Sequence, residues 1–125
     1  MGSINCYIPN RSGDKIEIDM IMLCQKGIYV IENKNYSGWI FGDEKSKNWC
    51  EILKGKKYFF YNPIKQNKSH IKNLEKQLQV GDDKYVSLIT FNANANLKKV
   101  STESSGISVV GYKQLKKFMK KQTDK

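Results

Sequence analysis

Two apolar runs decide the fold of this chain: residues 16–23 read IEIDMIML, and residues 28–34 read IYVIENK. Turn residues separate the two runs, and this composition predicts the two antiparallel strands of a hairpin. Each run also carries charged residues in its interior, namely Glu17, Asp19, Glu32 and Lys34. Because residues two apart share one face of a strand, the charged side chains of each run project together.

The register of the hairpin decides whether the charged pairs meet. If Cys24 lies opposite Gly27, Asp19 faces Glu32; if the loop is centred one residue later, Asp19 faces Lys34 instead. Directly opposed side chains lie about 4.5–5.5 Å apart at Cβ, so two carboxylates there can share one cation. A register shifted by an odd number of residues would place the two carboxylates on opposite faces of the sheet, unless a β-bulge compensated for the shift.

Residues 35–61 are predicted to continue as an antiparallel meander, because aromatic-rich runs alternate with turns at short intervals. The strands are expected at residues 38–42, 48–52 and 58–61. Their large aromatic side chains can either pack in the sheet and core or serve as platforms on which bases stack. Packing is the favoured interpretation for Trp39, Trp49 and the run from Tyr58 to Tyr61.

A helix is predicted to follow, because Asn62 is a favoured N-cap residue and Pro63 fits the first helical position. Gly81 is expected to end it. A mostly apolar stripe at helical spacing comprises Ile64, Asn67, Ile71, Leu74 and Leu78. A strand at residues 85–91 then favours a parallel crossover, and a short strand at 107–110 and a terminal helix at 112–121 complete the prediction.

The chain is strongly basic, with 22 Lys and Arg residues against 12 Asp and Glu residues and a formal net charge of +10. A field of that sign attracts polyanions, most commonly nucleic acid. The predicted helix carries a basic stripe whose members are candidate phosphate contacts: Lys65, Lys68, Lys72 and Lys76. Between the two stripes lies a polar flank, formed by Gln66, His70 and Asn73.

The length predicts one domain, assigned to residues 15–121, with a tail at 122–125. Residues 1–14 are interpreted as a polar, turn-like segment whose first three residues can be an expression-tag remnant. Without an apolar run long enough for a membrane span, or a signal peptide, we expect a cytoplasmic chain. Three scattered cysteines favour reduced structural thiols, and the abundant Asn and Lys suggest an AT-rich bacterial or mobile-element genome.

Asp19, Glu32 and Lys34 are residue types that phosphodiester hydrolysis uses. Mg²⁺ prefers oxygen ligands and usually takes one or two protein carboxylates, and a bound divalent metal activates water. The ammonium group of Lys34 can orient the attacking water and stabilise the developing negative charge. The alternative is a solvated sheet face with weak cross-strand ion pairs, and spacing alone leaves the two interpretations evenly balanced.

Together with the residues that follow, this constellation resembles the nuclease-related domain (NERD) family. That family is a branch of the restriction-endonuclease-like PD-(D/E)XK nucleases, whose signature is an Asp followed by Glu-X-Lys. The resemblance spans about residues 15–110. The matching residues are Glu17–Asp19, Gly27–Gly38, Trp49 and the helix start Asn62–Asn67, with His70, Ile71 and Leu74.

The resemblance implies an α/β fold with a restriction-endonuclease-like mixed β-sheet, an antiparallel meander, a crossover helix and a C-terminal helix. It also implies Mg²⁺-dependent cleavage of DNA, with Mn²⁺ as a possible substitute. By position, Asp19 and Glu32 would bind the metal with the backbone carbonyl of Asn33, and Lys34 would be catalytic. Glu17 would support this site or a second metal.

Two helix residues also have counterparts in the family. Gln66 matches a glutamine that could face the site, although simple hydrogen bonding on the helix surface explains it nearly as well. For His70 the surface interpretation is the favoured one. A non-catalytic nucleic-acid-binding module on the same fold is the alternative function, and a basic scaffold domain is a third class.

The chain departs from the family at its start. Such nucleases usually begin with a helix that packs on the sheet, and too few residues precede Lys15 to supply it. Apolar sheet surface would then be covered by another copy of the chain or by an additional domain. We therefore expect either a homo-oligomer or an additional domain that covers the sheet.

Overall fold

The computed structural model describes residues 3–9, 15–24, 27–81, 84–92, 94–111, 114 and 117. For residues 3–9 and 15–20, and for Met22 and Cys24, it describes the backbone alone. The side chains of Glu17 and Asp19 therefore lie outside the described part, as does most of the predicted terminal helix at 112–121.

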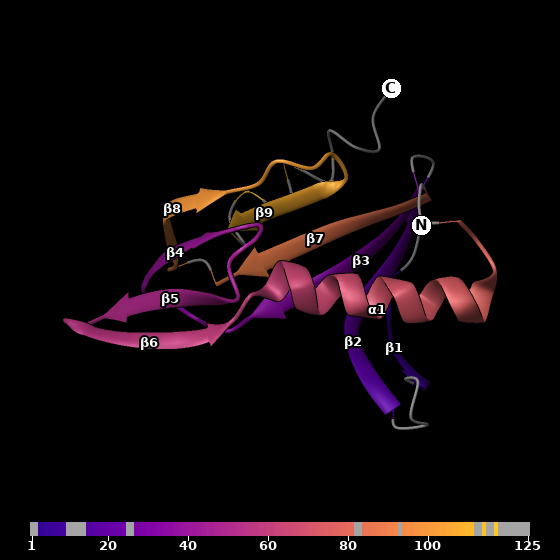
Figure 1. Ribbon diagram of the computed structural model, residues 1–125, viewed down its shortest axis with the longest axis horizontal. Coiled ribbons are helices and arrows are strands. Elements are labelled where there is room, and N and C mark those ends of the chain that lie inside the picture. The colour runs from indigo at the N-terminus through magenta and orange to yellow at the C-terminus, as the bar shows by residue number, and fades with distance from the viewer. Residues whose placement is uncertain are drawn as a thin grey trace.

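The described chain forms two β-sheets and one long helix (Figure 1). The first sheet has the strand order β1-β2-β3-β7-β9, with β1 Ser3–Pro9, β2 Lys15–Cys24, β3 Gly27–Lys34, β7 Tyr85–Phe91 and β9 Ile107–Gly111. The second has the order β6-β5-β4-β8, with β4 Trp39–Asp43, β5 Asn48–Leu53, β6 Lys56–Tyr61 and β8 Asn96–Ser101. Helix α1 spans Pro63–Leu78. This mixed α/β architecture confirms the predicted fold class.

The first sheet is mixed, as predicted. Strands β1, β2 and β3 pair antiparallel, whereas β7 pairs parallel to both β3 and β9. The chain passes from β3 through β4, β5, β6 and α1 before it returns as β7, so a helix-containing crossover links the two parallel neighbours. Figure 1 shows α1 running along the sheet beside β3 and β7.

The β2–β3 hairpin adopts the first of the two registers considered above. Cys24 pairs with Gly27, and the pairing continues to Met20 opposite Ile31. Continued by one residue, this register places the backbone of Asp19 beside that of Glu32. On its other side β2 is irregular: Ile21 pairs with Ile4 but Ile18 with Cys6, so two residues of β2 oppose one of β1. The extra residue is a β-bulge at Asp19–Met20.

Two strands were not predicted from the sequence. Residues 3–9, predicted to be turn-like, pair along β2, and the sequence there alternates Ile4, Cys6 and Ile8 with other residues. Strand β8, Asn96–Ser101, for which the sequence predicts no element, pairs parallel to β4. Both strands depend on pairing with distant partners. The predicted meander also forms its own sheet rather than extending the first hairpin.

The start of α1 agrees with the prediction, whereas its C-terminal end does not. The Asn62 side chain accepts a hydrogen bond from the backbone N–H of Ile64 and caps the helix, with Pro63 in its first turn. The helix ends at Leu78, because Gln79 adopts the left-handed conformation that Gly81 was expected to supply, with a φ of 56°. Among the described residues, no helix is long and apolar enough to cross a membrane.

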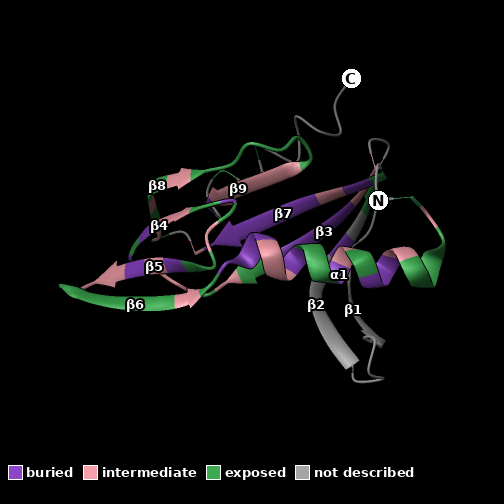
Figure 2. Cartoon of the chain, in the orientation of Figure 1, coloured by how far each residue is buried: buried purple, intermediate pink, exposed green. Residues whose placement is uncertain are grey.

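Buried residues lie along β3 and β7 and on α1 (Figure 2), and the core residues form two clusters. One lies between α1 and the first sheet and comprises Ile21, Val30, Leu74 and Tyr85. The other joins both sheets to the start of α1 and comprises Ile40, Trp49, Ile64, Ile89 and Phe91. Trp49 is only 1% exposed and stacks on Phe91, with ring centroids 6.3 Å apart. This second cluster holds the two sheets together.

Candidate active site

Glu32 and Lys34 lie side by side on β3, the middle strand of the first sheet. Lys34 Nζ is 3.5 Å from Glu32 Oε2, as the two-residue spacing on one strand predicts. Glu32 is only 6% exposed, and the side chain of Lys34 is 19% exposed. A buried carboxylate is costly unless a partner charge or hydrogen bond compensates it, and Lys34 supplies such a charge.

Helix α1 places Gln66 over Lys34. Lys34 Nζ donates a 2.7 Å hydrogen bond to Gln66 Oε1, which joins β3 to the first turns of the helix. The position of Gln66 follows from the cap, because its backbone N–H bonds to the carbonyl of Asn62. Gln66 therefore faces the charged pair, and this contact distinguishes it from a residue of the free helix surface.

His70 lies one helical turn beyond Gln66 on the same side of α1. It is 4% exposed, and its Nδ1 atom is 3.4 Å from Glu32 Oε1. The surface interpretation favoured from the sequence is therefore wrong for His70. Its burial depends on the approach of α1 to β3, and the four-residue spacing from Gln66 was the sequence signal that could have indicated it.

Asn67 fixes the helix against the sheet. Its Nδ2 donates to the backbone carbonyl of Val30, at 2.8 Å, and to Ser87 Oγ, at 2.9 Å. The residue is fully buried between β3 and β7. These two bonds limit both sliding and rotation of α1, so they determine where Gln66 and His70 sit above β3. The sequence placed Asn67 in a mostly apolar stripe and gave no sign of this role.

The remaining predicted metal ligands are only partly described. Asp19 and Glu17 are present as backbone, in the strand next to β3. The side chain of Asn33 accepts a hydrogen bond from Thr90 Oγ1 at 2.7 Å, which links β3 to β7. Within the described residues there is no group of three or more His, Cys, Asp or Glu side chains that could hold a metal ion.

The lysines of α1 do not converge on Glu32 and Lys34. Residues two apart on a helix point about 200° apart, so Lys68 and Lys72 face away from His70. These two lysines line a groove of about 400 Å³ on the other side of the helix, with Tyr85. Burial raises the pKa of the Tyr85 phenol, and nearby Glu75 adds to the effect. The other two lysines of the stripe are half-buried Lys65 and exposed Lys76.

The fold and the β3–α1 cluster define a mixed α/β domain that holds an acid and a lysine beneath a helix. The model of the nuclease-related domain family matches residues 4–92, and the chain belongs to this family. The family prediction is confirmed, and the family name suggests a nuclease-related function.

An uncharacterized protein of Bacillus anthracis is 36% identical to this chain over 124 residues. The match covers 96% of this chain but 56% of the relative, so the chain spans little more than half of the relative's length. No solved structure matches the chain.

Proposed function

We propose that this chain is a metal-dependent nuclease of the restriction-endonuclease-like superfamily that hydrolyses phosphodiester bonds in DNA. The observation that carries the proposal is the cluster of Glu32 and Lys34 under α1. In this cluster Gln66 contacts the lysine and His70 contacts the carboxylate. Membership of the nuclease-related domain family supports the same reaction class.

The donor chemistry suits Mg²⁺, with Mn²⁺ as a substitute. Glu32 offers a hard, nearly buried oxygen ligand, and the hairpin register carries the backbone of Asp19 alongside. We propose that these two carboxylates and the backbone carbonyl of Asn33 hold the ion, with Glu17 as a supporting acid. When bound, the ion would supply a Lewis acid and lower the pKa of water.

Lys34 supplies positive charge where the phosphate gains negative charge. An ammonium group is compact and mobile, so it stabilises developing charge well only when it is held in one place. The 2.7 Å bond to Gln66 and the neighbouring Glu32 carboxylate restrict it from two sides. We therefore assign Lys34 to water orientation and charge stabilisation. The lysines of α1 are assigned to phosphate contacts.

The test measures cleavage and metal binding separately. Linear, circular and single-stranded DNA are incubated with Mg²⁺, Mn²⁺ or EDTA, and Mn²⁺ binding is measured by calorimetry. Glu32→Gln should lose both cleavage and tight Mn²⁺ binding, whereas Lys34→Ala should lose cleavage and still bind Mn²⁺. Gln77→Ala, at an exposed position near the end of α1, is the matched control. Cleavage that survives Glu32→Gln would contradict the proposal.

The alternative is a non-catalytic nucleic-acid-binding module on the same fold. The position of Lys68 and Lys72, across the helix from Glu32, favours it, because phosphates bound there need not approach the charged pair. This function predicts salt-dependent DNA binding without cleavage under any metal. It also predicts that Lys68→Ala weakens binding, whereas Glu32→Gln leaves binding unchanged.

A further inference from the structure

The outer face of the second sheet carries four aromatic side chains, here called the aromatic face: Trp39, Phe41, Phe59 and Tyr61. Phe59 is 71% exposed, and Trp39 and Tyr61 are each 49% exposed. Their strand neighbours Ile40 and Phe60 point the other way and pack in the core with Trp49. The favoured packing interpretation therefore holds for Trp49 and Phe60 but is wrong for Trp39, Phe59 and Tyr61.

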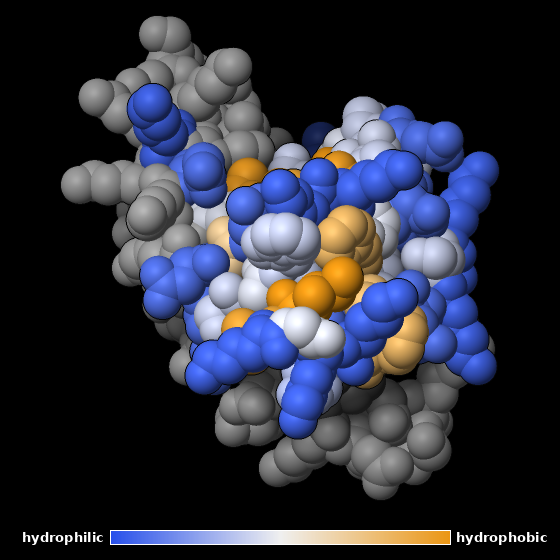
Figure 3. All heavy atoms as spheres, turned by 90° about the vertical axis from the view of Figure 1, so that its left-hand side faces the viewer, coloured by the Kyte–Doolittle hydropathy of each residue, from blue (hydrophilic) through white to orange (hydrophobic). Residues whose placement is uncertain are grey.

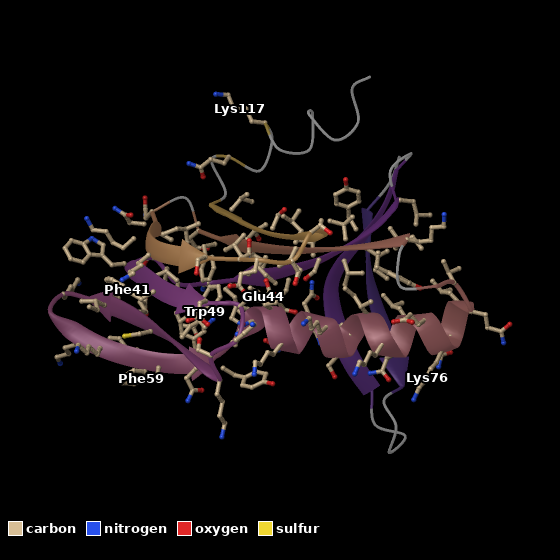
Figure 4. All side chains as sticks on the ribbon, turned by 45° about the horizontal axis from the view of Figure 1, so that its top comes forward. Phe41, Glu44, Trp49, Phe59, Lys76 and Lys117 are labelled. Carbon is tan, nitrogen blue, oxygen red and sulfur yellow. The ribbon has the colours of Figure 1, made fainter. Side chains whose placement is uncertain are left out.

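Strand pairing arranges the aromatic face in rows. Phe41 and Phe59 lie on either side of Cys50, on β4 and β6 with β5 between them (Figure 4). In the neighbouring row, Trp39 lies opposite Ile52. Cys50 and Ile52 thus lie beside the phenylalanine and tryptophan rings, while Tyr61 lies beside Asn48.

Lysines flank the aromatic face on both edge strands of the sheet. Lys57 lies on β6, and Lys99 pairs with Phe41 from β8. A register shift inserts one extra residue in β8, so Lys98 and Lys99 are both exposed rather than alternating. Lys98 Nζ lies 4.6 Å from the centroid of the Trp39 ring, a cation–π distance.

A groove of about 550 Å³ extends the aromatic face at its Trp39 end, between Leu53 and Asn96. Figure 3 looks onto this end of the molecule and shows apolar residues in the centre with hydrophilic residues around them. Asp43, at the end of β4, accepts hydrogen bonds from the backbone N–H groups of Lys45 and Ser46, which lower its pKa. The Asp43 carboxylate, at the edge of the aromatic face, is thus already hydrogen-bonded within its own turn.

We propose that the aromatic face binds single-stranded nucleic acid. Unpaired bases would stack on Phe59, Tyr61 and Trp39, and phosphates would contact the flanking lysines, as in proteins that combine stacking platforms with basic grooves. A duplex hides the faces of its bases, so this surface should prefer single strands. Pairing of the aromatic face with a second copy of the chain is disfavoured, because it would bring two sets of like-charged lysines together. The proposal goes beyond the nuclease function and does not depend on it.

The test measures binding in EDTA, so cleavage plays no part. Labelled oligo-dT and oligo-U of 12 nucleotides, and a duplex of the same length, are titrated by fluorescence anisotropy. Phe59→Ala should weaken binding of the single strands by roughly 5- to 100-fold, the range for loss of one stacked base. Tyr58→Ala is the matched control, because Tyr58 is also exposed on β6 but lies on the core side with Phe60. Comparison of oligo-dT with oligo-U shows whether the aromatic face prefers DNA or RNA.

Tryptophan fluorescence gives an independent readout. The chain has two tryptophans, and Trp49 is buried, so quenching by a bound base should come from Trp39. Trp39→Phe should keep most of the binding and lose the quenching. Tyr61→Ala is a second weakened variant if Phe59→Ala does not fold.

Three results would overturn the proposal. One is equal affinity of wild type and Phe59→Ala for the single strands. Another is an equal loss of affinity in Tyr58→Ala. The last is a dimer, seen by sedimentation, that Phe59→Ala dissociates while no oligonucleotide binds. Because each result concerns binding in EDTA, none depends on whether the chain cleaves DNA.

Discussion

His70 Nδ1 lies 3.4 Å from Glu32 Oε1, while Lys34 Nζ lies 3.5 Å from the other oxygen of the same carboxylate. One side chain from α1 and one from β3 therefore hold Glu32 from two directions. A carboxylate held in this way has little freedom to rotate. Partners that orient a metal ligand are commonly as important to the site as the ligand itself. We assign His70 as a positioning residue for Glu32.

Substitution of His70 should weaken metal binding. His70→Ala is expected to lower the affinity for Mn²⁺ by roughly 10- to 100-fold, because Glu32 loses a partner that orients it. Isothermal titration calorimetry measures this directly. His70→Gln keeps a hydrogen-bonding group of similar reach and should restore part of the affinity. An unchanged Mn²⁺ affinity in a folded His70→Ala variant would show that His70 serves packing alone.

Gln66 should affect turnover more than DNA binding. Gln66→Ala removes the 2.7 Å hydrogen bond that restrains Lys34 Nζ. Since a hydrogen bond to a charged group contributes roughly 1.5–3 kcal/mol, kcat should fall by about 10- to 100-fold. KM should change little, whereas the free energy of unfolding should fall by up to about 3 kcal/mol, because the same bond joins α1 to β3. Gln77→Ala, at an exposed position near the end of α1, is the matched control, and an equal loss of kcat there would contradict the assignment.

The parts of the fold that depend on local sequence could be predicted. The β2–β3 hairpin, the Asn62-Pro63 helix start and the strand at residues 85–91 each carry their signals within a few residues. The one-face placement of Glu32 and Lys34 follows from strand geometry alone. Strand β1 could not be predicted with equal ease, because its formation depends on pairing along β2.

The polar residues of α1 show the same limit within the site. From the sequence, His70 differs little from an ordinary polar residue of a helix surface, and Asn67 lies in the mostly apolar stripe without any sign of its polar partners. Both are buried, because α1 packs close to β3 and each finds a partner there. A buried polar group is stable only with such partners, and those are set by tertiary contacts rather than by helical spacing. The proposed metal site with Asp19 stays a prediction.

Asn62 should be one of the most sensitive positions for stability. Its Nδ2 donates to the backbone carbonyls of Asp43, Glu44 and Ser46, at 3.1, 3.0 and 2.7 Å, while its Oδ1 accepts from Ile64 N. Asn62→Ala removes the cap and the hydrogen bonds to the Glu44 and Ser46 carbonyls, whereas the Asp43 carbonyl still accepts a bond from Trp49 Nε1. The free energy of unfolding should fall by about 2–4 kcal/mol, as measured by urea denaturation.

A second substitution separates the two roles of Asn62. Asn62→Asp retains an oxygen that can cap Ile64 N but replaces the donor with a carboxylate facing three carbonyl groups. It should therefore destabilise the chain nearly as much as Asn62→Ala. Asn48→Ala, at an exposed position on β5, is the control. If Asn62→Asp were as stable as wild type, capping alone would account for the contribution of Asn62 to stability.

Glu44 connects the turn after β4 to the loop between β8 and β9, close to the start of α1 (Figure 4). Its carboxylate accepts a hydrogen bond from Ser104 Oγ and others from the backbone N–H groups of Ser104, at 2.9 Å, and Glu103, at 2.7 Å. These bonds, helped by the charge of Lys68, lower the pKa of Glu44 from 4.5 to about 2.

This pKa predicts how acid should affect stability. Because the pKa is lower in the folded state, the ionised carboxylate stabilises the fold fully above pH 4.5, and this contribution is lost as the pH falls towards 2. Wild type should thus be more stable than Glu44→Gln at neutral pH, and urea unfolding at several pH values should show the difference shrinking below pH 4.5. Glu103→Gln is the control, because Glu103 contacts Glu44 through its backbone. A difference that stayed constant down to pH 2 would mean that the Glu44 contacts do not depend on its charge.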